Sequence, residues 1–319
     1  MARIAYLGPE GTFTEAALLQ ITASGLVPEQ GTDTRPLPLD STPAALNAVR
    51  DGDAEYACVP IENSIDGSVM PTLDSLAIGS PLQVFAETTL DVAFSIVVKP
   101  GRSAADVHTL AAFPVALAQV REWLAAHLPR AEQRPAYSNA DAARQVADGE
   151  ADAAVTSSLA AAHWGLDALA DGVVDEPNAR TRFVLVGLPG PPPARTGADR
   201  TSVVMRIDNV PGALLAALAE FAIRGIDLTR IESRPTRTEL GTYLFFVDCV
   251  GHIDDGAVAE ALKALHRRCA NVRYLGSWPT GAAAGVLPPS ADEASRWLAR
   301  LLSGKSEQAQ DSAPRGVGR

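Results

Sequence analysis

The stretch IAYLGPEGTFTE, residues 4–15, indicates the fold class, because it combines a short buried strand, a tight turn and a helix start. Ile4–Leu7 is an apolar run, and the turn residues 8–11 end it. Thr12 and Glu15 then form a T-x-x-E capping box, which satisfies free N–H groups at the beginning of a helix. A strand that leads directly into a helix predicts one unit of an α/β domain.

The same alternation continues through the first half of the chain. Thr42-Pro43 begins a helix that ends at Asp51-Gly52, and the apolar run 56–59 predicts a strand that ends at Pro60. The repetition favours a parallel α/β sheet. A β-rich stretch over 82–98 indicates a crossing into a second lobe. In that lobe we expect strands at 109–113, 136–138 and 153–156, and helices at 114–128 and 139–148. A late strand at 183–186 would return the chain to the first lobe, and two lobes joined by crossings imply a cleft.

The second half begins after a break at residues 189–193, where three consecutive prolines favour a stiff, extended linker. Strand patterns at 201–207, 226–233, 242–250 and 272–275 enclose two helices, one ending at Arg224 and one over 255–269. The order βαββαβ predicts a ferredoxin-like domain. The sequence therefore predicts a domain over 3–188 with its second lobe at about 80–158, a linker over 189–199, a domain over 200–278, and a partly disordered tail over 279–319 that contains one amphipathic helix at 292–302.

Composition and charge exclude several classes of function. The 319 residues include 27 Lys+Arg against 38 Asp+Glu, a net charge of −11, and no basic cluster stands out, so we expect neither nucleic acid nor an anionic membrane surface as a partner. The three cysteines and five histidines lack metal-ligand spacing, so no metal site is predicted. No apolar stretch approaches the ~20 residues of a membrane helix, and no signal peptide precedes the first strand. We therefore expect a cytoplasmic protein.

Three motifs of the first domain are candidates for chemistry. The turn 8–12 would offer backbone N–H groups to an anion, although an ordinary βα turn would have the same pattern. Residues 60–64 place an acid, an amide and a hydroxyl after a strand, where open α/β sheets bind ligands; a helix-capping turn is the alternative. Arg180-Thr181-Arg182 could hold a carboxylate beside a proton donor, unless both arginines pair with surface carboxylates.

Taken together, these segments resemble the prephenate dehydratase family over residues 3–278. The resemblance is carried by GPEGTF at 8–13, PIENS at 60–64 followed by Gly67-Ser68, and TRF at 181–183. The second domain is similar to an ACT domain, with GALL at 212–215 and ESRP at 232–235, although the family usually has valine in place of Leu215. The resemblance implies a two-lobed catalytic domain similar to a type 2 periplasmic binding protein, followed by a regulatory ferredoxin-like ACT domain. It also implies a monofunctional enzyme without a chorismate mutase domain.

The resemblance implies roles for individual residues as well. Thr181 would be the catalytic proton donor. Both carboxylates of the substrate need donors, and the residues expected to bind the substrate are Gly11, Thr12, Glu62, Asn63, Ser64, Arg182 and Phe183, with Phe183 near the ring. Glu62 would either orient the site or cap a helix. The expected phenylalanine site comprises Asp208, Asn209, Gly212, Ala213, Leu214, Glu232, Ser233 and Arg234.

The implied reaction converts prephenate to phenylpyruvate, CO2 and water in L-phenylalanine biosynthesis, with feedback by phenylalanine at the ACT domain. No metal or organic cofactor is needed. ACT domains commonly bind ligands between paired copies, so we expect a homodimer or homotetramer through the ACT and catalytic domains. Two alternatives stay open. One is an arogenate dehydratase acting on the amino-acid analogue of prephenate, and the other is a non-catalytic amino-acid-sensing protein.

Overall fold

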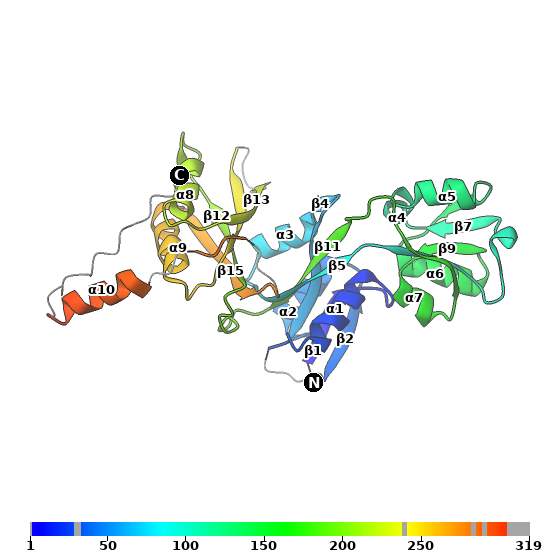
Figure 1. The fold of residues 1–319 in the computed structure, drawn as a ribbon, viewed down its shortest axis with the longest axis horizontal. Coiled ribbons are helices and arrows are strands. Elements are labelled where there is room, and N and C mark those ends of the chain that lie inside the picture. Colours follow the sequence, from blue (N-terminus) through cyan, green and yellow to red (C-terminus); the bar gives the residue numbers. More distant parts are fainter. Residues whose placement is uncertain (1, 29–32, 238–240, 282–284, 289–291, 305–319) are drawn as a thin grey trace, which may run out of the picture.

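The computed structural model describes residues 2–28, 33–237, 241–281, 285–288 and 292–304, and it contains three β-sheets (Figure 1). The chain builds most of one lobe, crosses into a second lobe, returns to the first, and then continues into the second domain. We refer to the first two units as lobe 1 and lobe 2. Lobe 1 lies between lobe 2 and the second domain (Figure 1).

The sheet of lobe 1 is mixed, whereas the sequence predicts a parallel one. Its strands, in pairing order, are β2 (Thr34–Leu39), β1 (Ala2–Leu7), β3 (Tyr56–Asn63), β11 (Arg180–Gly187) and β5 (Gln83–Asp91), with β4 (Gly67–Ser68) paired to β3. β1 runs parallel to β2 and β3, but β11 runs antiparallel to both β3 and β5. The reason is the crossing: β5 leaves toward lobe 2, and β11 comes back from it.

Strand β3 continues three residues beyond its predicted end at Pro60. The register of β3 with β11 pairs Glu62 with Arg182 and Pro60 with Phe183, so it skips Ile61. Such a bulge lets the ladder pass a proline, which has no N–H to donate. The continuation matters because it carries Glu62 and Asn63 onto the sheet and sets them directly beside β11.

Helices cover both faces of this sheet. α1 (Phe13–Ala23) packs on one face, while α2 (Thr42–Asp51) and α3 (Met70–Ala77) pack on the other. As predicted, Thr12 caps α1, its hydroxyl accepting from the Glu15 N–H at 3.4 Å. The capping box is nevertheless incomplete, because the Glu15 carboxylate accepts from the N–H of Gly11 instead of Thr12.

Lobe 2 has its own sheet, in the order β10 (Asp167–Val173), β6 (Phe94–Val98), β9 (Ala153–Thr156), β7 (Thr109–Ala112) and β8 (Glu132–Pro135). Its helices are the 3-10 turn η1 (Ala104–Asp106), α4 (Pro114–Ala118), α5 (Arg121–His127), α6 (Asn139–Asp148) and α7 (Ser158–His163). The helix predicted at 114–128 is broken, since Val120 has a non-helical ψ of 17°. The strand predicted at 136–138 lies earlier, at β8, whose four residues are all exposed and so lack an apolar signal.

The second domain has the predicted ferredoxin-like arrangement. Its antiparallel sheet has the order β13 (Leu228–Pro235), β14 (Tyr243–Val250), β12 (Asp199–Arg206) and β15 (Asn271–Pro279). α8 (Ala213–Ala222) and α9 (Gly256–Arg268) pack on one face of this sheet. The predicted tail helix is present as α10 (Asp292–Leu302), away from the sheets in Figure 1. The predicted disorder of the tail end falls on residues 305–319, outside the described residues.

The other face of this sheet packs on lobe 1. Val204, Phe246, Leu275 and Trp278 belong to the same buried apolar cluster as Val84 and the α2 and α3 side chains of lobe 1. At this joint β15 runs against β5, and Gly276 permits the approach because a Cβ there would lie 2.3 Å from the Val84 carbonyl oxygen. None of the described helices is long and apolar enough to cross a membrane.

Candidate active site

Thr181 and Asn63 form the centre of the candidate site. They are partners in the β3–β11 register, and the Asn63 amide Nδ2 donates to the Thr181 hydroxyl at 2.9 Å. The amide orientation is held from its other end, because Asn63 Oδ1 accepts from the N–H groups of Ile65 (2.8 Å) and Asp66 (3.0 Å). Both side chains are half-buried. The predicted amide and the predicted proton donor are therefore brought together.

Ser64 secures the turn beside this pair. Its hydroxyl accepts from the Arg180 N–H at 2.8 Å and lies 3.2 Å from the Asn178 carbonyl, to which it donates. Its backbone N–H also donates to the Arg180 carbonyl at 2.8 Å. These bonds tie the end of β3 to the start of β11. In this structure Ser64 holds the chain next to Thr181.

The glycine turn at Gly11 and Thr12 lies at the contact between the two lobes. Gly11 has a φ of +86°, and a Cβ there would come within 2.8 Å of the Ala160 Cβ in lobe 2. The Gly11 carbonyl accepts from the Ser157 hydroxyl of lobe 2 at 2.5 Å. The Gly11 N–H, a predicted anion donor, already donates to the Glu15 carboxylate at 2.5 Å. An incoming carboxylate would have to replace Glu15 there.

Two residues of this contact were not among the predicted site residues. Glu15 was interpreted only as part of a helix cap, although its carboxylate occupies the predicted anion position. Ser157 directly follows β9 and caps α7, its hydroxyl accepting from the Ala160 N–H at 3.1 Å. The signal for Ser157 was present, because it directly follows a buried strand in the same way as Ser64 directly follows β3.

Arg182 and Glu62 lie on the opposite face of the sheet from Thr181 and Asn63. Successive side chains of a strand point to opposite faces, so the neighbours of the central pair face the second domain. The Arg182 guanidinium lies 2.9 Å from Glu62, 3.3 Å from Glu87 and 2.8 Å from Asp248 of the second domain. The Arg182 side chain is only 8% exposed. Its predicted contact with a substrate carboxylate remains a prediction, but the guanidinium is engaged elsewhere.

Burial and charge act against each other around Arg182. Burial raises the pKa of Glu87 to about 7, and the Arg182 guanidinium limits that rise. Burial alone would also raise the pKa of Asp248, but the Arg230 and Arg182 guanidiniums outweigh it and hold that pKa well below its ordinary value. Asp248 is therefore an anion fixed between arginines.

Phe183 is buried within lobe 1. It belongs to an apolar cluster with Ile4, Leu18 and Ile21 and is 2% exposed. Phe183 is two residues after Thr181 on β11, so its side chain points to the same face of the sheet, where it packs beneath α1. The structure thus places Phe183 in the core, and its expected contact with the substrate ring remains a prediction.

The residues predicted to bind phenylalanine fall into two groups. Gly212, with φ +81°, caps α8, and Asp208, Asn209, Ala213 and Leu214 flank it on the helix side of the sheet. Glu232 and Arg234 face lobe 1 instead, where Glu232 accepts from the Ser68 hydroxyl at 3.1 Å and Arg234 pairs with Asp74 at 3.0 Å. Ser233, between them, is exposed. One copy of the chain does not bring the two groups together.

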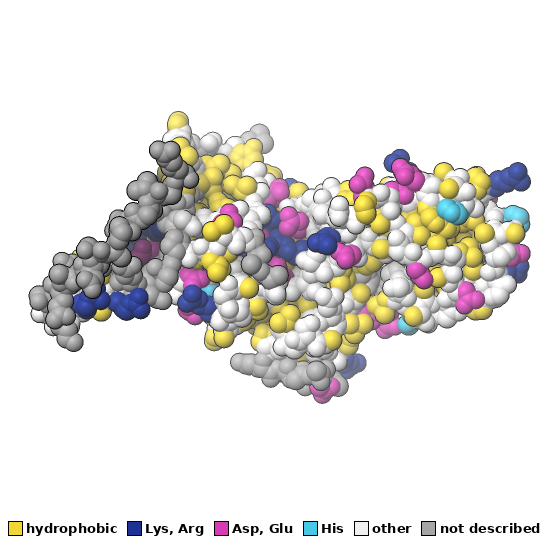
Figure 2. All heavy atoms as spheres, in the orientation of Figure 1, with side chains coloured by type: hydrophobic (Ala, Val, Ile, Leu, Met, Phe, Trp, Pro, Cys, Tyr) yellow, Lys and Arg dark blue, Asp and Glu magenta, His cyan; other side chains and the backbone are white. Residues whose placement is uncertain are grey.

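Exposed apolar side chains surround this part of the second domain. Val210, Leu215 and Ile223 are 60%, 74% and 73% exposed, and Ile231 on β13 is half-exposed. Apolar atoms gather on the same end of the molecule in Figure 2. Leu215 is the residue at which the chain departs from the usual valine of the family motif.

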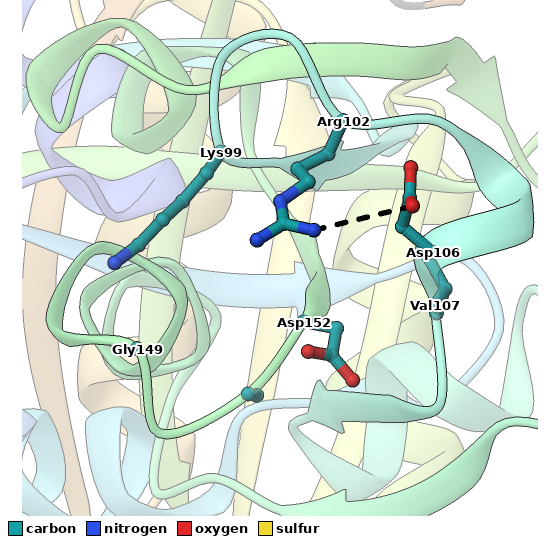
Figure 3. A pocket seen from close by; sticks show the side chains of 7 residues that line it. Lys99, Arg102, Asp106, Val107, Gly149 and Asp152 are labelled. Atoms are coloured by element: carbon teal, nitrogen blue, oxygen red, sulfur yellow. Dashed lines mark ion pairs between the residues drawn. The ribbon is translucent and has the colours of Figure 1, made fainter.

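A hollow in lobe 2 contains none of the predicted site residues. It lies between the end of β6, η1 and the turn before β9, and Lys99, Arg102, Asp106 and Asp152 line it (Figure 3). Most of these charges already have partners: Arg102 lies 3.9 Å from Asp106, and Asp152 accepts from the Thr109 N–H at 2.9 Å. No group of three or more His, Cys, Asp or Glu that could hold a metal ion is found within the described part of the chain.

Comparison with known proteins gives consistent matches to both domains. The prephenate dehydratase family matches residues 4–190, and the ACT domain family matches residues 201–267. A curated prephenate dehydratase from Mycobacterium tuberculosis (strain ATCC 25618 / H37Rv) is 83% identical over 309 residues, which cover 97% of this chain and 96% of that protein.

Solved structures agree. Prephenate dehydratase from Arthrobacter aurescens, in complex with L-Phe, is 40% identical with a TM-score of 0.83 and covers 95% of this chain and 100% of that one. GqqA, described as a novel type of quorum quenching acylase, is 30% identical with a TM-score of 0.76 and covers 87% of this chain and 97% of that one.

Proposed function

This chain belongs to the prephenate dehydratase family and carries an ACT domain, and from that premise we propose that it converts prephenate to phenylpyruvate, CO2 and water with Thr181 as the proton donor. The observation that carries this role is the hydrogen bond from Asn63 Nδ2 to the Thr181 hydroxyl. This bond occupies a lone pair of the hydroxyl oxygen, so the Thr181 proton is directed elsewhere, toward a bound substrate.

The reaction requires such a donor because hydroxide is a poor leaving group. The bond from the ring to its carboxylate breaks, CO2 leaves, and the electron pair moves through the ring and expels the hydroxyl. Proton donation by Thr181 turns that hydroxyl into water, and Thr181 then takes a proton back from solvent. A positioned donor typically accelerates such a step by about 10²–10⁴-fold. The Asn63 N–H stabilises the negative charge that develops on the Thr181 oxygen.

The two carboxylates of prephenate require different treatment. Tight binding of the departing carboxylate in the ground state would slow its loss, so the strongest donors belong with the pyruvyl carboxylate. We assign that group to the turn at Gly11 and Thr12, at the N-terminus of α1, with the Glu15 carboxylate moving aside. The hydroxyl of Ser157 in lobe 2 already donates to the Gly11 carbonyl, which supports a site assembled from both lobes.

The direct test is phenylpyruvate formation from prephenate by Thr181→Val and Thr181→Ser. Valine keeps the volume and removes the hydroxyl, so kcat should fall by about 10²–10⁴-fold with little change in KM. Serine keeps the hydroxyl and should retain most of the activity. Full activity of Thr181→Val would show that Thr181 is not the proton donor, but it would not contradict the dehydratase activity itself.

Other substrates separate the remaining alternatives. Turnover of arogenate in preference to prephenate by the unmodified chain would indicate an arogenate dehydratase. Acylase activity without prephenate turnover would align the chain with the acylase relative instead. Phenylalanine binding without any turnover would indicate a sensor.

We further propose that phenylalanine inhibits the enzyme by binding between two ACT domains in a homodimer or a dimer-based tetramer. The L-Phe complex of the Arthrobacter aurescens relative supports the ligand. The separation of the Gly212 and Glu232 groups within one copy supports a site shared by two copies, and the exposed Leu215 and Ile223 supply apolar surface for pairing. Sedimentation velocity with and without phenylalanine tests the assembly, and a monomer that still responds to phenylalanine would contradict it.

A further inference from the structure

We propose that Arg182 is a positioning residue, which couples the ACT domain to Thr181 through Asp248 and does not contact the substrate. The inference rests on the proposed catalytic role of Thr181 and adds the route by which the ACT domain reaches it. It starts from the placement of Arg182 on the face of β11 opposite to Thr181, inside the joint between lobe 1 and the ACT domain.

The joint contains a buried ion network that belongs to both domains. Lobe 1 contributes Arg182, Glu62 and Glu87, and the ACT domain contributes Asp248, Arg200 and Arg230. Asp248 is the centre: it accepts from Arg182 at 2.8 Å, from Arg230 at 2.9 Å and from the Ser202 hydroxyl at 2.7 Å. Trp278 of β15 donates its Nε1–H to Glu87 at 2.9 Å. The network therefore joins three arginines and three carboxyl groups.

Because the network is buried, its ion pairs cannot be separated without a large cost in free energy. Asp248 and the Arg230 side chain are 1% and 5% exposed, and Arg182 and Glu87 are 8% and 7% exposed. A buried ion that loses one partner leaves an uncompensated charge, which is strongly unfavourable. A displacement of β14 must therefore carry Arg182 with it or break the network.

The network flanks the catalytic pair on both strands. Arg182 is the chain neighbour of Thr181 on β11, and Glu62 is the chain neighbour of Asn63 on β3. The bulge between residues 182 and 183 lies at the same point, where the ladder is already irregular. A shift of Arg182 and Glu62 is thereby passed through one peptide unit to the hydrogen bond between Asn63 and Thr181.

The predicted effector residues connect to the same face. β13 carries Arg230 of the network, and two and four residues later Glu232 and Arg234, which contact Ser68 and Asp74 of lobe 1. An effector that engages Glu232 or Arg234 would compete with these contacts and move β13 against lobe 1. By reciprocity, the state that holds Thr181 correctly would bind the effector less well.

The experiment compares Arg182→Lys and Asp248→Asn with the unmodified chain, measuring kcat, KM for prephenate and the phenylalanine concentration that halves activity. Lysine keeps the charge but cannot span Glu62, Glu87 and Asp248 together. We expect kcat to fall by about 10-fold in Arg182→Lys with KM within about 3-fold, because the substrate contacts remain. In Asp248→Asn the inhibitory concentration should rise at least about 10-fold, within the usual range of allosteric coupling.

Two further measurements separate coupling from a general loss of structure. Asp248→Asn should still bind phenylalanine by calorimetry, so that binding is retained while inhibition is lost. The double variant should differ little from the stronger single variant, since both changes break one network. Glu220→Gln is the matched control, because Glu220 pairs with Arg224 and Arg268 within the ACT domain, away from lobe 1. It should leave inhibition unchanged.

The outcomes are distinct. A rise of 10-fold or more in KM for Arg182→Lys, with normal inhibition of Asp248→Asn, would show that Arg182 binds the substrate and would overturn the inference. Should Asp248→Asn fail to fold, Ser202→Ala removes one donor to Asp248 and should raise the inhibitory concentration by a few-fold; an unchanged value would again overturn it. Absence of prephenate turnover in the unmodified chain would contradict the proposed function instead.

Discussion

Lobe 1 meets the ACT domain through a broad buried face, but it meets lobe 2 through two crossing segments, one glycine turn and the first residue of α1. The first joint contains the apolar side chains of Val204, Phe246 and Trp278 and the ion network around Asp248. The second joint contains the chain passages after β5 and before β11, the Gly11–Ala160 approach, the Ser157 hydrogen bond and the edge-to-face contact of Phe13 with Phe94 of lobe 2.

The difference indicates which parts move together. Burial of apolar surface and paired ions holds lobe 1 and the ACT domain as one body, whereas the sparse contact with lobe 2 permits hinge motion around the crossing segments. The candidate site, with Thr181 and Gly11, lies at the joint with lobe 2, which we call the weak joint. Of the predicted effector residues, Glu232 and Arg234 lie at the joint between lobe 1 and the ACT domain, which we call the strong joint. In the route proposed above, regulation acts through β11 and β3, because each strand carries one residue of the ion network next to one residue of the catalytic pair.

The largest expected effect is on the strong joint. Gly276 has a φ of +135°, and a Cβ would lie 2.3 Å from the Val84 carbonyl oxygen, so Gly276→Ala forces β15 away from β5. Steric crowding and backbone strain together should lower the unfolding temperature by about 5–10 °C. Gly281→Ala is the control, because its φ is also positive (+75°) but, among the residues that the structure describes, no atom beyond its chain neighbours lies within 4 Å of the added Cβ. Equal losses in both variants would mean that the joint contributes little.

The weak joint should respond in activity more than in stability. Gly11→Ala would bring a Cβ within 2.8 Å of the Ala160 Cβ and should keep the lobes apart. We expect kcat/KM to fall by about 10–100-fold, because a displacement of about 1 Å at a site costs about that much. Ala160→Gly should restore part of the activity in the Gly11→Ala background. A loss of unfolding temperature as large as that of Gly276→Ala would contradict the distinction between the two joints.

A smaller effect follows from Glu87 in the strong joint. Burial raises its pKa to about 7, above the ordinary value of 4.5, so between these values the folded protein binds more protons than the unfolded chain. Stability should therefore fall as the pH rises through this window. Arg182, Arg200 and the Trp278 N–H face Glu87, and none of them titrates there. Glu87→Gln should flatten this part of the curve of unfolding temperature against pH. An unchanged slope would show that Glu87 is not the group that titrates in this window.

The smallest expected effect comes from an ion pair outside both joints, and it serves as a reference for the effects predicted at the joints. Arg3 and Glu55 pair at 2.8 Å on the surface of lobe 1, with side chains 44% and 42% exposed. The hydrogen bonds from Arg3 lower the pKa of Glu55 to about 2, so the contribution of the pair is lost as the pH falls from about 4.5 toward 2. Because exposed pairs contribute little, Arg3→Ala should shift the unfolding temperature by no more than about 2 °C. A larger shift would mean that surface charges rival the buried network.

The sequence predicted elements best where local chemistry decides them. The helices α1 and α2 follow from their capping residues, and the ferredoxin-like domain follows from its alternating strands. Prediction failed where no local signal exists: β8 is an exposed edge strand, and the break at Val120 interrupts an otherwise continuous apolar pattern. The antiparallel insertion of β11 was also missed, because the alternation of strands and helices indicates a parallel sheet and does not show how a strand returns from another lobe.

For the candidate site, the sequence by itself determined which residue types are present. It predicted Arg182 beside Thr181 at the substrate, whereas in the structure the two side chains lie on opposite faces of β11, because strand side chains alternate. It identified the family through motifs that lie far apart along the chain. Only the tertiary structure decided which residues the side chains of Thr181 and Arg182 contact. Asn63 reaches Thr181 across 118 positions of sequence, and Arg182 reaches Asp248 across 66. Both contacts depend on the order in which strands pair and domains pack, which local residue chemistry does not encode.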